Sequence, residues 1–259
     1  MKILLSFFRY LNFLASSGNE HSIHSPFIFD IYTKAIRSKK QYYSFPIIEN
    51  IRDKMLSCED VIQVKDYGTG HQLEQSRKIK DIARISLKKP RLGQILFQLV
   101  AYCEPRYIID LGTSLGITTM YLANAKPTSS VKSFEGCVNI SRFALANFKK
   151  AGVKNIEIIT GNIDDTLMEG IHSIPKIDFV FFDANHTYDA TLRYFEICLQ
   201  KADTESVFIF DDIHWSAGME AAWERIKANE KVTLSIDLFH MGIIFFRRNQ
   251  PKQHFILRI

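Results

Sequence analysis

The chain has 259 residues, of which 33 are Lys or Arg and 28 are Asp or Glu, giving a formal net charge of +5. Its apolar fraction of 46% and charged fraction of 24% are ordinary for a globular protein with a substantial core. This mild positive charge falls well short of that of a dedicated nucleic-acid-binding arm. The cysteines form no CxxC pair, which predicts reduced thiols in a cytoplasmic protein rather than a zinc site or a disulfide framework: Cys58, Cys103, Cys137 and Cys198.

The first fourteen residues are rich in apolar side chains but do not have the pattern of a signal peptide. Arg9 interrupts the apolar run after Phe8, and no small-residue cleavage site follows. The apolar side chains recur at helical spacing instead: Ile3, Leu4, Phe7, Phe8, Leu11 and Leu14. We therefore expect an amphipathic helix that packs on the protein, with contact to a membrane surface as the alternative. No stretch is long enough to form a transmembrane segment.

The following residues give mixed signals up to a boundary at Pro90, which disfavours a helical conformation in the residue before it. The sequence HSIHSP at 21–26 predicts a turn, and Phe27–Arg37 predicts a helix. These features predict two domains. Residues 1–90 are expected to form a helical extension that caps the active site, and residues 91–259 the catalytic domain.

After Pro90, short apolar runs alternate with helical patterns. The runs typical of strands are Tyr107–Asp110, Val131–Glu135, Ile156–Thr160, Ile177–Asp183 and Ser206–Asp211. The helical candidates are Thr118–Ala125, Asn139–Lys150, Ala190–Lys201 and Gly218–Asn229. Such alternation predicts a parallel sheet covered by helices on both faces. Two further runs with only a short connector, Thr233–Phe239 and Gly242–Arg247, predict a closing antiparallel hairpin. The expected fold is a doubly wound, Rossmann-like α/β domain with a mostly parallel seven-stranded sheet.

A glycine-containing loop follows the first strand of this domain, in the sequence YIIDLGTSLG. Glycines at 112 and 116, with Ser114 between them, let the backbone turn sharply and approach a ligand closely. In an open α/β sheet this position lies at the carboxyl edge, where ligands bind. Taken alone, the same pattern is also compatible with an ordinary turn between strand and helix.

The second strand ends in Glu135, which lies 25 residues after Asp110. A carboxylate at this strand end is the expected partner of two ribose hydroxyls, so loop and acid together predict an adenosine-containing cofactor. The spacing of Gly112, Ser114 and Gly116 departs from the GxGxxG pattern of dinucleotide-binding proteins, and so does the closing hairpin. S-adenosylmethionine is therefore favoured over NAD.

A second segment, VKDYGTG at 64–70, also has the pattern of a strand, an aspartate and a glycine loop. No acid at a strand end follows it about twenty residues later, which makes it a poor second cofactor site. Two interpretations remain open for it, a structural turn and a loop that covers the pocket.

Acidic residues end the fourth and fifth predicted strands, in FVFFDANHTY and FIFDDIHW. Because neighbouring parallel strands end at the same edge, Asp183, Asp211 and Asp212 are expected to converge near the cofactor loop. Crowded carboxylates repel each other unless a cation or protons neutralise them, and oxygen ligands favour Mg²⁺, Ca²⁺ or Mn²⁺. The alternative is that the acids act separately, one of the pair capping the next helix and Asp183 binding a cofactor or substrate amine.

Taken together, DLGTSLG, the Glu135 strand end, FFDANHTY and FDDIHW resemble the catechol O-methyltransferase-like and macrocin O-methyltransferase-like group of class I methyltransferases, methyltransferase family 24, over roughly residues 90–247. The resemblance implies an S-adenosylmethionine-dependent methyltransferase. It implies cofactor contacts by the first loop, the second-strand acid, the end of the third strand and the fourth-strand acid: Asp110, Gly112, Thr113, Ser114, Gly116, Glu135, Gly161, Asn162 and Asp183. It also implies that Asp183, Asp211 and Asp212 bind Mg²⁺ or Mn²⁺, which orients the substrate oxygens.

The residues near the fourth-strand acid differ from those of catechol-type enzymes, which often place a lysine there as the base. Here His186 is the candidate base, and we expect Asp183, His186 and Asp211 to be the catalytic residues. His214 and Trp215 either line the acceptor pocket or pack the turn after the fifth strand.

The acceptor is expected to be a small hydroxylated molecule. Seven basic residues lie within residues 77–91, at the start of the catalytic domain and just before it: Arg77, Lys78, Lys80, Arg84, Lys88, Lys89 and Arg91. They are interleaved with apolar residues as on the solvated side of a packed helix, and no aromatic residues for base stacking accompany them. The alternatives are a transfer RNA methyltransferase of the same fold and a non-catalytic cofactor-binding protein. A homodimer is compatible with the sequence.

Overall fold

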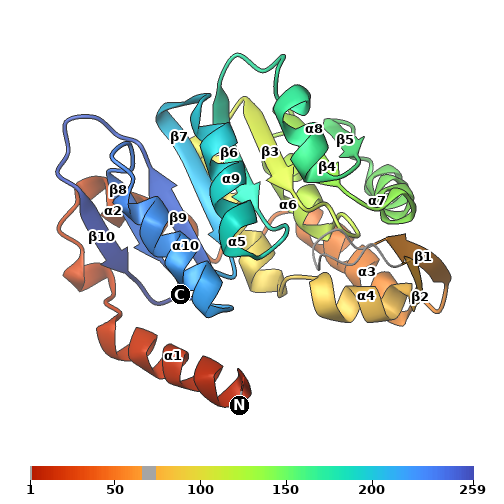
Figure 1. Cartoon of the computed structure of the whole chain (residues 1–259), viewed down its shortest axis with the longest axis horizontal. Coiled ribbons are helices and arrows are strands. Elements are labelled where there is room, and N and C mark those ends of the chain that lie inside the picture. Colours follow the sequence, from red (N-terminus) through yellow and green to blue (C-terminus); the bar gives the residue numbers. More distant parts are fainter. Residues whose placement is uncertain (1, 66–73) are drawn as a thin grey trace. The chain divides into compact units, whose positions relative to one another are not determined.

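The computed structural model describes residues 2–65 and 74–259, and side chains from Phe7 onward. The chain divides into two compact units (Figure 1). One, here called the terminal unit, combines Met1–Thr33 with Pro175–Ile259, and the other, the middle unit, consists of Lys34–Ile174.

The middle unit contains a parallel sheet whose strands are close to those predicted. They are β3 (Tyr107–Leu111), β4 (Ser130–Glu135) and β5 (Ile156–Thr160), hydrogen bonded in this order. The register pairs Asp110 with Ser133 and Glu135 with Thr160, so β3, β4 and β5 end at one edge. The helices after Pro90 are α5 (Pro90–Cys103), α6 (Ile117–Ala125), α7 (Val138–Ala151) and α8 (Ile163–Gly170).

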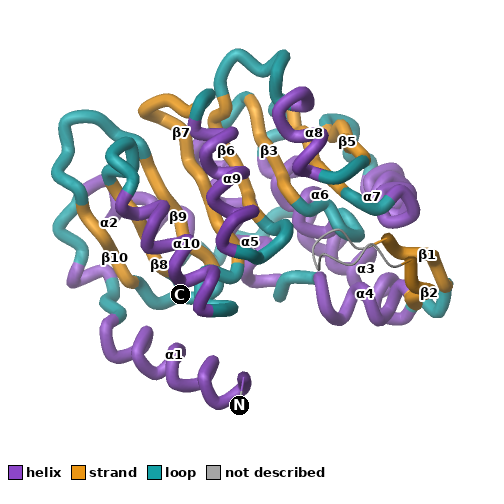
Figure 2. Tube along the Cα trace, viewed as in Figure 1, coloured by secondary structure: helices purple, strands orange, loops and turns teal. Residues whose placement is uncertain are grey.

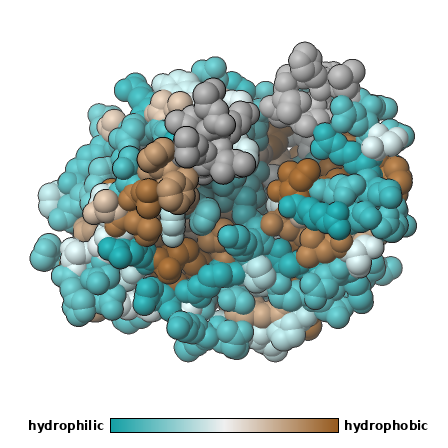
Figure 3. All heavy atoms as spheres, turned by 90° about the horizontal axis from the view of Figure 1, so that it is seen from below, coloured by the Kyte–Doolittle hydropathy of each residue, from teal (hydrophilic) through white to brown (hydrophobic). Residues whose placement is uncertain are grey.

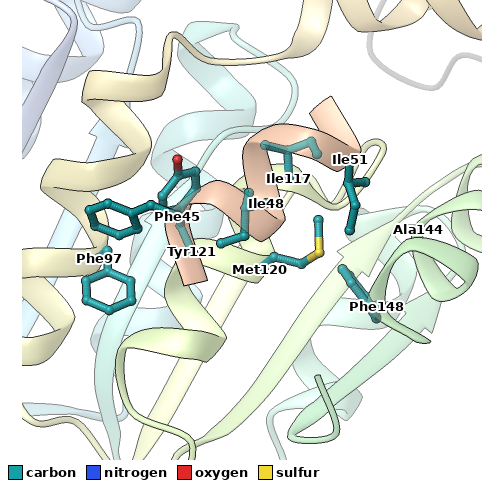
Figure 4. Packing of buried hydrophobic residues seen from close by; sticks show 9 residues of the cluster. All are labelled: Phe45, Ile48, Ile51, Phe97, Ile117, Met120, Tyr121, Ala144 and Phe148. Atoms are coloured by element: carbon teal, nitrogen blue, oxygen red, sulfur yellow. The ribbon is translucent and has the colours of Figure 1, made fainter. Parts of the chain in front are cut away.

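A buried apolar cluster joins four helices of the middle unit (Figure 4). The helix α3 (Ser44–Ser57) contributes Phe45, Ile48 and Ile51 to it, although this helix precedes Pro90. The ring of Phe45 contacts that of Phe97 from α5 edge-to-face, with centroids 4.9 Å apart. The remaining members come from α6 and α7: Ile117, Met120, Tyr121, Ala144 and Phe148. Residues 44–57 are therefore part of the same hydrophobic core as the helices that cover the sheet.

The middle unit also contains a hairpin that the sequence did not predict. Its antiparallel strands are β1 (Val61–Lys65) and β2 (Glu74–Lys78), and the short helix α4 (Ile79–Ser86) follows directly. The extension is thus not wholly helical, since polar runs such as EQSRK carry little strand signal. Of the segment 64–70, the first two residues lie in β1 and the rest lie outside the described residues.

The terminal unit contains five strands, in the order β10-β8-β9-β7-β6 (Figures 1 and 2). They are β6 (Ile177–Phe182), β7 (Ala202–Asp211), β8 (Leu234–Asp237), β9 (Met241–Phe245) and β10 (Gln253–Ile256). Strands β6 and β7 are parallel, and β9 is antiparallel to both β7 and β8, which confirms the predicted hairpin. Strand β10, parallel to β8, is one strand beyond the seven expected. The helices between these strands are α9 (Tyr188–Leu199), which joins β6 to β7, and α10 (Ala217–Ala228), which joins β7 to β8. The predicted α/β class with a mostly parallel sheet and a closing hairpin is confirmed.

The N-terminal segment begins with the predicted helix, α1 (Lys2–Ser16). Phe13 is buried, whereas Phe7, Phe8 and Leu11 are exposed, and apolar side chains form patches on the face shown in Figure 3. Gly18 N donates to the carbonyl of Ile256 at the end of β10. The chain continues through a short 3₁₀ helix (Glu20–Ser22), α2 (Pro26–Ile31) and one π-helical turn (Tyr32–Ile36), where the sequence predicts a helix. No helix among the described residues combines the length and apolarity that crossing a membrane requires.

Candidate active site

The loop after β3 turns through three residues in the left-handed region: Gly112 at φ 110°, Ser114 at φ 47° and Gly116 at φ 83°. At Gly116 a Cβ atom would lie 2.5 Å from Cε1 of Phe148, so only glycine fits between the loop and α7. The backbone N–H groups of Gly112 and Thr113 both donate to the carbonyl of Phe134, at 3.1 and 3.0 Å. These bonds tie the glycine loop to β4.

Glu135 lies at the end of β4, beside this loop, as the sequence predicts. One carboxylate oxygen accepts a hydrogen bond from Ser114 N at 2.8 Å, and the other accepts one from Cys137 N at 2.9 Å. Burial raises the pKa of the Glu135 carboxyl, and the backbone N–H groups of Cys137 and Ser114 oppose that rise. Both carboxylate oxygens keep further lone pairs, and Glu135 is partly exposed, so it can accept hydrogen bonds from a ligand beside the loop.

Asp110 is fully buried beneath the loop. Its Oδ2 accepts hydrogen bonds from Thr119 Oγ1 at 2.6 Å and Ser133 Oγ at 2.7 Å, and Ser133 also bonds Thr113 Oγ1 at 2.6 Å. The hydroxyls thus join β3, β4, α6 and the loop in one network. Sequence reasoning missed Ser133 and Thr119, although the parallel pairing of the two strands places Ser133 opposite Asp110.

The end of β5 completes this edge of the middle unit. Gly161, at φ 143°, donates from its backbone N to the carbonyl of Glu135 at 2.9 Å. The side-chain oxygen of Asn162 accepts a hydrogen bond from Asp164 N at 3.2 Å and so caps α8. The structure therefore brings Gly161 beside Glu135 and gives Asn162 a helix-capping role.

In the terminal unit, Asp183, His186 and Asp211 form a compact group. One ligand atom from each residue lies within 4.8 Å of the others, and His186 Nε2 is 3.5 Å from Asp183 Oδ1. The geometry follows from the parallel pairing of β6 and β7, which aligns Phe182 with Phe210 and leaves the two aspartates side by side after them. Asp211 is buried, while Asp183 and His186 are partly exposed.

This set of donors fits a divalent cation. Two carboxylates so close together repel each other, and a cation between them would remove that repulsion. Carboxylate oxygens suit Mg²⁺ and Mn²⁺, and imidazole is a common additional ligand for first-row metals. The set differs in one member from the predicted one, because the group contains His186, expected as a base, and not Asp212.

Asp212 lies in the turn that follows β7, where its φ is 52°. Its backbone N donates to the carbonyl of His240 at 2.7 Å, and its own carbonyl accepts from Trp215 N at 2.9 Å. The indole of Trp215 is 71% exposed. Asp212 therefore contributes its backbone to the turn, and its role as a metal ligand stays a prediction.

His214 is hydrogen bonded within this turn region, and whether it also lines the acceptor pocket stays a prediction. Its Nε2 lies 2.8 Å from Asp237 Oδ2 and its Nδ1 lies 3.2 Å from Glu220 Oε1. Burial alone would lower the pKa of His214, but the hydrogen bonds and charges of Asp237 and Glu220 outweigh burial and raise it. The half-buried imidazole thus lies between two carboxylates that favour its protonated form.

Residues 109–213 match the family model described as a methyltransferase domain, and this match confirms the resemblance to methyltransferase family 24. The matched segment runs from β3 to the turn after β7 and so contains every predicted site residue. A comparison with curated proteins gave no match.

Solved structures of methyltransferases share the fold. An O-methyltransferase from Bacillus cereus in complex with SAH is 18% identical, with a TM-score of 0.57 over 83% of this chain and 99% of that one. The O-methyltransferase TomG from Streptomyces achromogenes, in complex with SAM, is 19% identical, with a TM-score of 0.55 over 62% and 82%. SAH-bound PaMTH1 from Podospora anserina is 11% identical, with a TM-score of 0.60 over 87% and 97%. Family match and fold define the class of this protein, an S-adenosylmethionine-dependent methyltransferase.

Proposed function

We propose that this methyltransferase transfers the methyl group of S-adenosylmethionine to a hydroxyl oxygen of a small molecule, with help from a divalent cation. The observation that carries the proposal is the group formed by Asp183, His186 and Asp211 at the ends of two paired strands. An enzyme that only had to bind the methyl donor would not need two adjacent carboxylates and an imidazole. Both solved O-methyltransferases described above support oxygen as the methyl acceptor.

The middle unit would bind the methyl donor. We infer that the Glu135 carboxylate accepts hydrogen bonds from the two ribose hydroxyls. Its two oxygens offer about four acceptor positions, and the backbone N–H groups of Ser114, Gly136 and Cys137 leave room for further donors. Gly112 and Gly116 have no side chain, which would let the methionine portion of S-adenosylmethionine approach the backbone of the loop that also contains Thr113 and Ser114. Asp110 would stabilise the loop from below. Gly161 and Asn162 would flank the adenine, and Asp183 is the candidate acceptor for the methionine ammonium.

The terminal unit would activate the acceptor. Asp183 and Asp211 would bind Mg²⁺ or Mn²⁺, with Asp212 as the further predicted ligand, and the cation would supply stabilisation of the deprotonated hydroxyl. His186 has two roles that exclude each other at any one moment. It either completes the ligand set, or it accepts the hydroxyl proton on Nε2 as the general base.

The reaction balances without an oxidant or a further reactant. The acceptor O–H proton moves to the base, a bond forms between the oxygen and the methyl carbon, and the bond from that carbon to sulfur breaks with its electron pair staying on sulfur. S-adenosylhomocysteine and a methyl ether result. The protein contributes in-line positioning of the oxygen and the methyl group and a group that accepts the proton.

Internal contacts of the basic segment favour a small molecule over transfer RNA. Lys78 and Lys80 both pair with Glu59. Arg84 pairs with Asp81, and Arg91 donates to two backbone carbonyls. Cations engaged in this way are less available to phosphates. We further propose that residues 1–90 serve as the extension that selects the acceptor for the catalytic domain at 91–259, and that the protein acts in the cytoplasm as a homodimer.

Two measurements test the proposed function. Calorimetry should give micromolar affinity for S-adenosylhomocysteine, about −8 kcal/mol of binding free energy. A screen of catechols and sugar hydroxyls with labelled S-adenosylmethionine should give a product whose formation stops in EDTA and resumes with added Mg²⁺ or Mn²⁺. Full turnover in EDTA would show that methyl transfer does not need a divalent cation. Submicromolar, salt-sensitive binding of transfer RNA would replace the acceptor class, and cofactor binding without turnover on any acceptor would favour the non-catalytic alternative.

A further inference from the structure

Two turns of the terminal unit meet beside the acidic group. One follows β7 and consists of residues 212–215, directly after Asp211, and the other joins β8 to β9 and consists of residues 238–240. Each contains one residue in the left-handed region, Asp212 at φ 52° and Phe239 at φ 68°. L-residues with side chains rarely adopt this conformation, and a phenylalanine does so less readily than an aspartate. Surrounding contacts must therefore stabilise both turns.

Asp237 provides the contact that joins the two turns. Its Oδ2 is hydrogen bonded to His214 Nε2 at 2.8 Å, and its Oδ1 accepts from Phe239 N at 2.8 Å. The ring of Phe239 stacks on His214 with centroids 5.3 Å apart and an interplanar angle of 19°. The backbone bond from Asp212 N to His240 O runs beside this bridge. One buried carboxylate thus fixes both turns at once, and we refer to the pair as the His214–Asp237 bridge.

The bridge continues outward to two helices. His214 Nδ1 lies 3.2 Å from Glu220 Oε1 on α10, and the same carboxylate oxygen lies 2.9 Å from Arg9 Nε on α1. Each of these groups is at most one-third exposed. The imidazole ring of His214 is therefore fixed from both of its nitrogens, and the turn that carries Asp211 and Asp212 has little freedom to move.

We propose that His214 and Asp237 are positioning residues that keep Asp211 and the Asp212 turn in the geometry needed to bind the divalent cation. This inference rests on the proposed function. Neither residue belongs to the group of Asp183, His186 and Asp211, so the bridge acts through the backbone between His214 and Asp211. Hydrogen bonds behind a metal ligand commonly set its orientation, and losing them costs tenfold to hundredfold in metal affinity.

The test is Asp237→Asn in the full chain, with Mn²⁺ binding measured by the loss of the free-ion EPR signal. An amide oxygen can still accept from Phe239 N and an amide N–H can donate to His214 Nε2, but the charge-assisted hydrogen bond between Asp237 and His214 is lost, so the bridge is weakened. The Kd for Mn²⁺ should rise by about tenfold or more. Affinity for S-adenosylhomocysteine should stay within about twofold, because Glu135 and the glycine loop are stabilised by contacts within their own unit.

Two substitutions at His214 separate positioning from simple loss of stability. His214→Gln keeps an N–H that can reach Asp237, and we expect it to retain more Mn²⁺ affinity than His214→Leu, which removes every polar contact. Rescue by the conservative change supports the proposal. If Asp237→Asn does not fold, as judged by circular dichroism, His214→Gln and His214→Leu test the positioning role in its place. Equal Mn²⁺ affinities of these two variants would overturn the proposal.

Asp203→Asn is the matched control. Asp203 also accepts from a backbone N, that of Glu205 at 2.9 Å, and pairs with a cation, Lys176 at 3.0 Å, but it lies at the other end of β7, eight residues before Asp211. It should leave Mn²⁺ affinity unchanged. Wild-type Mn²⁺ affinity in Asp237→Asn refutes the inference. A wild-type chain that binds S-adenosylhomocysteine but no Mn²⁺ would instead refute the proposed cation site, and the inference that rests on it would fail for that reason.

Discussion

The two sites that this chain carries on its two units are built in opposite ways. At the glycine loop of the middle unit, Glu135 accepts hydrogen bonds from Ser114 N and Cys137 N, so the protein itself stabilises the carboxylate. At the strand ends of the terminal unit, the carboxylates of Asp183 and Asp211 lie in one group with the His186 imidazole. Backbone N–H groups thus hold the carboxylate of the first site, whereas the second site would be completed by the cation proposed above.

The largest loss of activity is expected at the acidic group of the terminal unit. Asp211→Asn removes a buried charge that a cation needs, so turnover should fall by about a thousandfold, the scale of several kcal/mol that a catalytic metal contributes. In EDTA the same change relieves repulsion with Asp183, so the thermal midpoint should stay equal or rise. Turnover assays and thermal melts with and without Mn²⁺ check both statements. A lower melting temperature in EDTA would mean that the acids are already neutralised within the protein.

The next largest effect, a loss of stability and of cofactor affinity, is expected at the glycine loop of the middle unit. Gly116→Ala introduces a Cβ that overlaps Phe148 at a φ of 83°, so the free energy of unfolding should fall by about 2–3 kcal/mol and cofactor affinity should fall with it. Denaturant titration and calorimetry measure the two losses. Gly152→Ala is the control, because Gly152 also has a positive φ but meets nothing within 4 Å. It should cost about 1 kcal/mol and leave binding unchanged.

Removing the Glu135 carboxylate should weaken cofactor binding, and it also removes the acceptor of Ser114 N and Cys137 N, so stability should be measured alongside affinity. Glu135→Ala should reduce the binding free energy of S-adenosylhomocysteine by about 1–3 kcal/mol, the range for hydrogen bonds to a charged group. Calorimetry at constant pH measures the change, and Glu157→Ala on the neighbouring strand is a control that leaves the loop intact. Equal affinities for both variants would remove Glu135 from the cofactor site.

The same carboxylate predicts a pH dependence. Burial raises the pKa of Glu135 above 4.5, so its proton binds at a higher pH than for an exposed glutamate. The ionised form is the hydrogen-bond acceptor, and affinity for S-adenosylhomocysteine should therefore be lost as pH falls through this raised pKa. Calorimetry between pH 7.5 and about 5 follows the loss, and Glu135→Gln should flatten the curve. A flat wild-type curve contradicts the assignment.

The smallest effect distinguishes capping from ligand contact at Asn162. Asn162→Ala removes the cap of α8 and should cost about 1 kcal/mol of stability. Asn162→Ser keeps a capping oxygen and should restore most of that loss. If Asn162 also contacts the adenine, both variants lose cofactor affinity; if it only caps the helix, Ser behaves like the wild type in calorimetry.

The sequence predicts strands β3 to β9 well, because most of them are largely apolar runs. It also predicts that Asp183 and Asp211 lie together, since that depends only on two adjacent parallel strands having similar ends. Strands β2 and β10 were missed because their sequences, EQSRK and QHFI, lack the apolar alternation that marks a strand. The sequence did show a strand pattern at the end of β1, but without β2 it did not predict a hairpin. Long-range side-chain pairs were missed for a different reason. Nothing local to His214 indicates that Asp237, 23 residues later, is its partner.

The exposure of Trp215 gives the terminal unit an optical reporter of its own. The chain has two tryptophans, and the other, Trp223 on α10, is only 2% exposed and packs over Gly242. Acrylamide should therefore quench the emission of Trp215 and leave that of Trp223 nearly unchanged. The quenchable emission comes from an indole four residues after Asp211, so its shift on adding Mn²⁺ or an acceptor would report on that turn without any label.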